Sequence, residues 1–206
     1  MGNMKILLAT QNKHKVDEIS RLLKPYAIDV ASLLDYPELG EIVEDGDSLE
    51  ANALIKAKAG YTHCGLPTLS DDTGLFVDAL DGAPGIYAAR YAGEQATYDD
   101  NVEKMLGAMK TVPEGKRQAQ FQTVAVFYDG KTSISAAGVV EGNISLSRQG
   151  NSGFGYDPIF IVDDTQKTYA QMDISEKNRL SHRKRAFESL LIKLNHTHQA
   201  FKVGLR

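Results

Sequence analysis

Two adjacent aspartates, Asp71 and Asp72, follow a short apolar stretch, Leu66–Leu69, that predicts the end of a strand. In an extended backbone neighbouring side chains point to opposite faces, so only one of these carboxylates can enter a given cleft. The pair restricts the fold, because the other carboxylate must hydrogen-bond to backbone or stay in water. It suits a site where one carboxylate meets a divalent cation or an attacking water while the other holds the loop. Closed by Gly74, the same residues also match an Asx-type turn that caps a strand.

Length and composition set the class of protein. The chain has 206 residues, enough for one large domain or for two lobes that share a sheet. Its 42% hydrophobic and 24% charged residues are typical of soluble globular proteins. The single cysteine, Cys64, excludes an internal disulfide and a cysteine-cluster metal site.

Charge and hydropathy limit the classes of molecule that this protein is expected to bind. No apolar run approaches the roughly 18 residues that a membrane helix needs, and residues 1–5 lack the apolar core of a signal peptide, so we expect a cytoplasmic protein. The formal net charge of −4 argues against a protein that coats DNA or RNA, because such proteins usually present a broad basic face. It leaves open a small polyanionic substrate, for which a local basic pocket and a metal ion suffice.

The N-terminal stretch predicts a strand, a basic turn and a helix. Residues 5–10 form a continuous apolar run, residues 11–15 are polar and basic, and apolar residues then recur at helical spacing until Pro25. The turn places Thr10, Asn12, Lys13 and Lys15 near a helix N-terminus, where backbone N–H groups and the helix dipole favour anions. The glycines of a Walker loop are absent. The alternative is a basic helix start on a solvated surface.

A second strand is expected over 27–32, then an acidic loop over 35–47 and a helix over 49–64 that Asp47 or Ser48 caps. Asn52 and Lys56 are four residues apart, so they share one face of that helix. Lys56 is either a surface charge or a group that reaches a phosphate.

The rest of the chain continues the mixture of strands and helices. The pattern predicts a strand or short helix over 75–80, a loop over 81–85 and a helix over 102–109. Residues 118–128 and 132–141 flank Asp129-Gly130, which signals a hairpin, and both faces of the first arm are apolar, which favours a central strand.

The C-terminal part holds two further candidates. Glycines at 150, 153 and 155 surround Phe154 and Tyr156, which either stack on a nucleobase or turn into the core. A strand follows over 159–162, a short helix over 175–180 and a last helix over 181–194. His182 and Arg183 occupy the first turn of the last helix, where the dipole disfavours cations, so they indicate an anionic or carbonyl-rich partner or simply a surface.

Taken together, these stretches resemble the inosine-triphosphate pyrophosphatase family, which cleaves non-canonical purine nucleoside triphosphates. The resemblance covers nearly the whole chain in the right order. The motifs are Thr10–Lys15, Glu44 with Asn52 and Lys56, Ser70–Gly74, Gly82–Tyr87 with Ala89–Tyr91, Gly153–Pro158, and Glu176-Lys177 with Ser181–Arg183. One departure is Gln11, which stands where the family usually has the glycine of Thr-Gly-Asn.

The resemblance implies a fold, an activity and an assembly. The fold would be α/β, a single domain over 1–206 of two lobes, with a long curved mixed central sheet flanked by helices and an active cleft between the lobes. The reaction would be hydrolysis of ITP, dITP and XTP to the nucleoside monophosphate and pyrophosphate. The cofactor would be Mg²⁺ and the assembly a homodimer.

The resemblance also implies roles for residues. Glu44 and Asp72 would ligate Mg²⁺, and Asp72 would be the catalytic group that orients the attacking water and accepts its proton. The triphosphate would be held by Thr10, Asn12, Lys13, Lys15 and Lys56. Phe154 would stack on the base, and Asp157, Lys177, His182 and Arg183 would surround its edge. Gln11, His14, Thr73, Arg90, Gly155 and Tyr156 complete the expected substrate-binding set.

Specificity would follow from donors that meet the 6-keto oxygen. Adenine has an amino group there, and a buried donor left unpaired costs about 1–3 kcal/mol. Two alternatives stay open: a pyrophosphatase for standard or pyrimidine triphosphates, and a nucleotide-binding protein without turnover. Glu44 and Asp72 argue against the second, because a pure binder needs no carboxylate that orients water.

Overall fold

The structure is a computed structural model that describes residues 4–26, 28–40 and 42–197. Residues 1–3, residue 27 of the strand predicted over 27–32 and residue 41 of the predicted acidic loop lie outside the described residues. The chain divides into two compact units, each of which is built from separate stretches. Unit 1 comprises Met1–Asp72, Thr123–Gly138 and Arg183–Arg206, and unit 2 comprises Thr73–Gln122 and Val139–His182.

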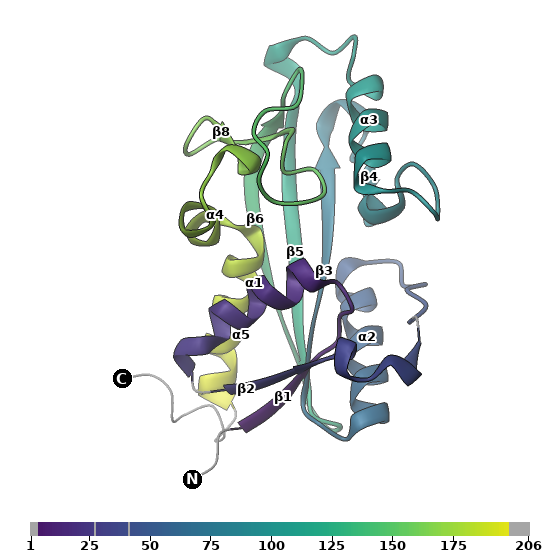
Figure 1. Cartoon of the computed structure of the whole chain (residues 1–206), viewed down its shortest axis with the longest axis vertical. Coiled ribbons are helices and arrows are strands. Elements are labelled where there is room, and N and C mark those ends of the chain that lie inside the picture. The colour runs from purple at the N-terminus through teal and green to yellow at the C-terminus, as the bar shows by residue number, and fades with distance from the viewer. Residues whose placement is uncertain (1–3, 27, 41, 198–206) are drawn as a thin grey trace. The chain divides into compact units, whose positions relative to one another are not determined.

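Helices and strands follow one another along the chain, and Figure 1 labels most of them. The strands are β1 (Met4–Leu8), β2 (Ile28–Ser32), β3 (Thr68–Val77), β4 (Pro84–Gly85), β5 (Gln118–Tyr128), β6 (Ser133–Ile144), β7 (Phe160–Val162) and β8 (Lys167–Thr168). The α-helices are α1 (Lys13–Leu23), α2 (Leu49–Cys64), α3 (Tyr98–Ala108), α4 (Ile174–Leu180) and α5 (His182–Thr197). Short 3₁₀ turns include η4 (Asp78–Leu80) and η5 (Ala88–Arg90).

Within the described residues the strands form one eight-stranded sheet in the order β2-β1-β3-β5-β6-β7-β8, with β4 paired to β3. β1 pairs in parallel with both β2 and β3, whereas β3–β4, β6–β7 and β7–β8 are antiparallel. The sheet is therefore mixed, as predicted, and β5 is a central strand between β3 and β6.

Helices cover both faces of the sheet in unit 1. Alternate residues of β5 face opposite ways: Ala125 and Phe127 pack with α1 and α5, whereas Val124 and Val126 pack against α2. This alternation follows from the pleat of the strand. The prediction that both faces of this arm are apolar is confirmed, and so is the α/β class with a mixed sheet flanked by helices.

One expectation about β3 is wrong. We expected the strand to end near Leu69 and the next residues to turn, but β3 continues without a break from Thr68 to Val77. Ser70–Gly74 is therefore extended backbone, in which the two aspartates must face opposite ways. A smaller correction concerns the loop predicted over 81–85, because Pro84 and Gly85 pair with Phe76 and Leu75 of β3.

Unit 2 has its own apolar core. It is built from α3, the second half of β3, the first half of β5 and the segment around β7, with Met105, Phe160 and Tyr169 fully buried. A buried arginine, Arg117, lies at the edge of this core and donates to carbonyl oxygens of Met109, Val112, Ile144 and Ser145.

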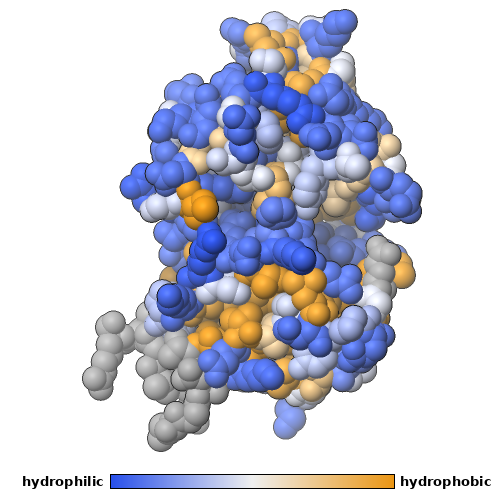
Figure 2. All heavy atoms as spheres, viewed as in Figure 1, coloured by the Kyte–Doolittle hydropathy of each residue, from blue (hydrophilic) through white to orange (hydrophobic). Residues whose placement is uncertain are grey.

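The surface is mostly polar. Figure 2 shows hydrophilic side chains over most of the visible face, with apolar patches between them. In the part of the chain that the structure describes, no helix combines the length and the apolar character needed to cross a membrane.

Candidate active site

β3 separates its two aspartates onto opposite faces of the sheet. Asp71 shares a face with Leu69, which packs with α1 and α5. Its carboxylate contacts Lys15 of α1 and Arg183 of α5. Asp72 shares the other face with Ser70, whose hydroxyl donates to the Ala53 carbonyl of α2 at 2.6 Å. The pleat thus gives the two neighbouring carboxylates different partners and different chemistry.

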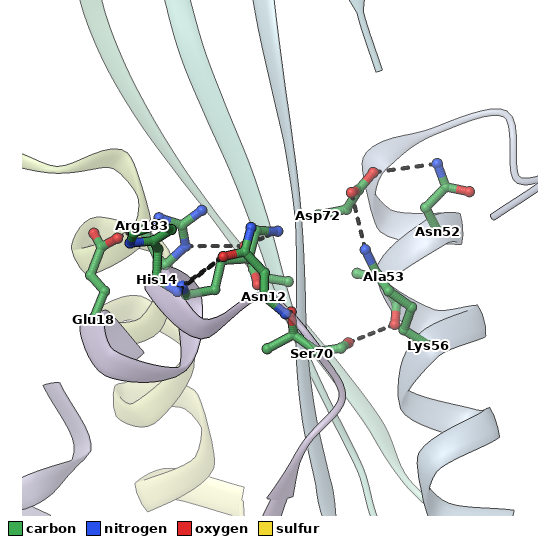
Figure 3. A network of polar contacts seen from close by, with 12 residues as sticks. Asn12, His14, Glu18, Asn52, Ala53, Lys56, Ser70, Asp72 and Arg183 are labelled. Atoms are coloured by element: carbon green, nitrogen blue, oxygen red, sulfur yellow. Dashed lines mark hydrogen bonds and ion pairs between the residues drawn. The ribbon is translucent and has the colours of Figure 1, made fainter. Parts of the chain in front are cut away.

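On the side of β3 that faces α2, Glu44 and Asp72 both contact the ammonium group of Lys56. Lys56 Nζ lies 2.8 Å from Glu44 Oε2 and 3.1 Å from Asp72 Oδ1. Asn52 Nδ2 donates to Asp72 Oδ2 at 3.3 Å, so the expected shared face of Asn52 and Lys56 is confirmed (Figure 3). Burial would lower the pKa of Lys56, but the charges of Asp72 and Glu44 outweigh it and the pKa is raised. The lysine is therefore a firmly charged, buried ammonium between two carboxylates.

This donor set fits Mg²⁺. Two carboxylates already converge on a single cationic atom, Lys56 Nζ, from different segments. Mg²⁺ usually binds one or two carboxylates together with waters and substrate phosphates, rather than a cage made only of protein groups. Among the described residues, no group of three or more His, Cys, Asp or Glu side chains is arranged to hold a metal ion without other ligands. Glu44 and Asp72 would hold the ion.

The basic turn between β1 and α1 is held by its own side chains. Asn12 caps α1, with Oδ1 accepting from the backbone N–H of His14 at 3.0 Å and of Lys15 at 3.4 Å. Thr10 Oγ1 accepts from the Asn12 N–H at 3.2 Å. Gln11 Nε2 donates to the Gly40 carbonyl at 3.0 Å. The turn is thus built without the glycine that the family pattern has at position 11, and Lys13 and His14 are exposed.

On the opposite face, Asp71 lies in a buried ionic network. Its Oδ2 is 3.0 Å from Lys15 Nζ and 3.1 Å from Arg183 Nε. Arg183 Nη1 also donates to Glu18 Oε2 at 2.6 Å, and Figure 3 shows these two residues side by side. Burial would raise the pKa of Asp71, but Lys15 and Arg183 outweigh it and hold the pKa well below its usual range. Burial lowers the pKa of Lys15 despite the attraction of Asp71. The network joins α1 and α5 to β3.

Unit 2 contains most of the residues expected around the base. Asp157 Oδ2 accepts from the Phe154 backbone N–H at 2.8 Å and is 2.6 Å from Lys177 Nζ. The same Nζ lies 4.8 Å from the centre of the Phe154 ring, on which the Tyr98 ring packs at 5.8 Å. A side chain at Gly153 would collide with the Asp157 carboxylate, so this loop requires glycine there.

The two aromatics of the glycine loop take different places. Tyr156 is buried and its hydroxyl donates to the Ala88 carbonyl at 2.9 Å, whereas Phe154 is partly exposed. Burial raises the pKa of Tyr156. His182 is also buried, and its ring stacks on Phe121 with the centroids 4.6 Å apart.

The remaining expected residues lie in unit 2. Arg90 stacks over the Tyr87 ring at 5.1 Å, and Thr73 and Gly155 are half-buried.

Unit 1 thus brings together Glu44, Lys56 and Asp72 on one face of β3 and Lys15 with Arg183 on the other. Unit 2 brings together Phe154, Asp157 and Lys177. Arg183, expected at the base edge, contacts Asp71 and Glu18.

Known proteins match this chain along almost its entire length. The family model described as the Ham1 family matches residues 6–193. The chain belongs to the Ham1 family.

Individual relatives agree with this assignment. A protein of Thermoanaerobacter sp. named "dITP/XTP pyrophosphatase" is 43% identical and aligns over 91% of this chain and 94% of its own length. A protein of the same name from Vibrio parahaemolyticus is 43% identical over 93% of this chain and 96% of its own. The structure of a HAM1 protein from Coxiella burnetii has a TM-score of 0.84 at 37% identity, with 94% of this chain and all 100% of that chain covered.

Sequence reasoning missed two residues of this Ham1 site. Glu18 gives no signal, because one acidic residue in an amphipathic helix is usually solvated, and only its distant partner Arg183 reveals its role. Gly46 lies in an acidic loop, where a glycine is unremarkable, yet its N–H donates to Asn52 Oδ1 at 2.8 Å. The acidic composition of this run predicts a loop, but the contact of the loop with α2 is set by tertiary structure.

The Asp71 network predicts the stability of this Ham1 protein in acid. Because the pKa of Asp71 in the folded state is below the unfolded value of about 3.9, its stabilising effect is fully present above that value. The effect is lost progressively as the pH falls below that value toward the lower pKa of the folded state. Asp71→Asn should lower the free energy of unfolding at pH 7 by about 3–5 kcal/mol, because Lys15 and Arg183 lose a buried partner. Urea denaturation between pH 7 and pH 2.5 measures this.

The dependence of the free energy of unfolding on pH tests whether the Asp71 network causes the loss of stability in acid. The wild type should lose stability more steeply below pH 5 than Asp71→Asn does. Asp17→Asn, which alters an exposed carboxylate on the same helix as Lys15, should keep the wild-type slope. Equal slopes for the wild type and Asp71→Asn would show that the network does not set the acid stability.

Proposed function

We propose that this Ham1 chain hydrolyses dITP, XTP and ITP to the nucleoside monophosphate and pyrophosphate. The names of its relatives support the reaction and the substrate class. The observation that carries the proposal is the convergence of Glu44 and Asp72 on Lys56 Nζ, since two carboxylates beside a buried ammonium suit a polyphosphate with its metal.

Glu44 and Asp72 would hold Mg²⁺, which when bound would neutralise negative charge on the triphosphate. Asp72 orients the attacking water and accepts its proton as the water oxygen bonds to the α-phosphorus. The bond from the α-phosphorus to the bridging oxygen breaks, and pyrophosphate leaves. Lys56 supplies positive charge beside both carboxylates and toward the phosphates. Thr10, Asn12, Lys13 and Lys15 contribute the remaining contacts to the triphosphate.

The base is recognised by unit 2 in this proposal. Phe154 offers a partly exposed ring for stacking, and Lys177 and Asp157 beside it supply a donor and an acceptor. Lys177 as a donor favours a 6-keto oxygen over the amino group of adenine, because a donor left unpaired costs about 1–3 kcal/mol. His182 lies against Phe121 in the same unit and completes the set that acts on the base edge.

The assembly and location are part of the same proposal. The protein acts as a homodimer in the cytoplasm, where free nucleotides are the substrate, and it needs no DNA or RNA. The net charge of −4 supports a small-molecule substrate over a nucleic acid. Analytical ultracentrifugation of the purified chain measures the dimer directly.

The products test the function. Purified protein with ITP and Mg²⁺ should release IMP and pyrophosphate, and EDTA should abolish the release because the triphosphate then lacks its metal. Ion-exchange chromatography of the products measures both. IDP with orthophosphate would contradict the proposal. Rates for ITP, XTP, dITP, GTP and ATP distinguish it from a pyrophosphatase for standard nucleotides, which would cleave GTP and ATP as fast as ITP.

A further inference from the structure

Asn52 uses both ends of its amide on groups that flank the proposed metal site. Its side chain is buried at 1% exposure in the first half of α2. Oδ1 accepts from the Gly46 backbone N–H at 2.8 Å, and Nδ2 donates to Asp72 Oδ2 at 3.3 Å. One partner is a donor and the other is an acceptor, so the two contacts fix the orientation of the amide. Figure 3 shows Asn52 pointing toward Asp72 from α2.

Gly46 must lie close to Asn52 for this contact to form. A Cβ atom at position 46 would come within 2.7 Å of Asn52 Oδ1 and 2.8 Å of the Ala51 Cβ. Both distances are shorter than real side chains tolerate, and the Ala51 Cβ and the start of α2 cannot move aside as the end of a flexible side chain would. Glycine is therefore required here by space, and any larger residue pushes the loop away from α2.

The loop that Gly46 anchors is the one that carries Glu44. Ser48 fixes its other end as the N-cap of α2, with Oγ accepting from the Ala51 N–H at 3.2 Å. The Asn52 N–H donates to the Ser48 carbonyl at 3.0 Å. Glu44 therefore lies in a segment that is hydrogen-bonded to Asn52 of α2 through Gly46, two residues after Glu44. Asp72 is hydrogen-bonded to the same Asn52 side chain.

We propose that Gly46 and Asn52 are positioning residues that set the place of Glu44 relative to Asp72, and thereby the affinity for the divalent cation. This inference rests on the proposed function, which assigns the two carboxylates to Mg²⁺. Groups that orient metal ligands without touching the metal typically change metal affinity by about 10–100-fold when they are replaced. Lys56 holds the same two carboxylates through charge, whereas Asn52 fixes the backbone from which one of them extends.

Two variants test the inference in different ways. Asn52→Leu removes both hydrogen bonds at similar side-chain size, and Gly46→Ala displaces the loop while Asn52 and Asp72 stay intact. Binding of Mn²⁺ alone, measured by electron paramagnetic resonance below the melting temperature, should weaken by about 10–100-fold in both. Half-maximal turnover of ITP should need correspondingly more Mg²⁺, and saturating Mg²⁺ should restore much of the rate.

Asn101 offers a matched control. Its amide is also buried, at 2% exposure, and also bonds twice to a loop, to the Ala89 carbonyl at 2.9 Å and the Ala92 N–H at 2.7 Å. Asn101→Leu should cost comparable stability and leave Mn²⁺ affinity within about twofold of the wild type, because it touches neither carboxylate nor the Glu44 loop.

The outcomes separate the inference from the proposed function. If Gly46→Ala binds Mn²⁺ with wild-type affinity and still releases pyrophosphate from ITP, the positioning role is overturned and the proposed function is retained. If the wild-type protein releases no pyrophosphate from ITP but both variants bind Mn²⁺ more weakly than it does, the positioning role is supported and the proposed function is overturned. If Asn52→Leu does not fold, Gly46→Ala alone decides.

Discussion

Replacing Asp72 with asparagine should reduce pyrophosphate release from ITP by about 10²–10⁴-fold, the range typical of a lost general base. Asparagine has the same size and its amide oxygen can still accept from Asn52, so the local packing is kept. It carries no charge to share with Glu44 around a cation and does not accept a proton from water. Initial rates at saturating Mg²⁺ measure the loss.

Binding of the nucleotide separates chemistry from recognition in this variant. ITP should still bind to Asp72→Asn within about tenfold of the wild-type affinity, since the residues proposed for the base and most of those for the phosphates are unchanged. Asp78→Asn, an exposed aspartate in η4, should keep wild-type rates. An Asp72→Asn variant with more than a tenth of the wild-type rate would remove this residue from the mechanism.

Arg117→Met should lower the stability of the protein as much as Asp71→Asn does. Arg117 is 3% exposed, and its guanidinium donates at 2.6–2.9 Å to four carbonyl oxygens. Two of these carbonyls lie in the segment that follows α3, and the other two belong to the last residue of β6 and the residue after it. Methionine fills much of the volume but leaves these buried acceptors without a charged donor. The free energy of unfolding should fall by about 3–5 kcal/mol, as measured by urea denaturation.

A surface arginine provides the comparison. Arg148 pairs with Asp99 and Glu103, whose side chains are 81% and 69% exposed. Water screens such pairs, so Arg148→Met should cost far less than Arg117→Met. Equal costs for the two variants would show that the carbonyl contacts of Arg117 do not hold unit 2 together.

The local sequence pattern predicted the helices and strands well, and it failed where residues far away in the sequence determine the structure. Helical spacing placed Asn52 and Lys56 on one face of α2, and the apolar character of both faces of residues 121–128 indicated a central strand. The composition of Ser70–Gly74 favours a turn, and no local signal shows that the strand continues. It continues because each aspartate meets cations or donors from helices far away in the sequence, such as Arg183.

The same limit applies to the candidate site. Spacing says which residues share a helix face, but it does not say which carboxylate they meet 16 or 20 residues later. The glycines at 150–155 signalled an unusual loop, yet they did not show that Tyr156 turns into the core while Phe154 stays partly exposed. Only the packing of unit 2 decides between the two rings.

The alternation along β3 has a consequence for how this gene can vary in length. Inserting or deleting one residue between Thr68 and Asp71 would exchange the two faces of the strand from that point on. After a deletion Asp72 would take the place of Asp71 beside Lys15 and Arg183, and Thr73 would take the place of Asp72 on the α2 side. After an insertion Asp71 would move to the α2 side, and Ser70 would face Lys15 and Arg183 without a carboxylate. Changes of length near this strand are therefore expected only in the connection that precedes it, between Cys64 and Pro67, where the backbone can absorb an extra residue.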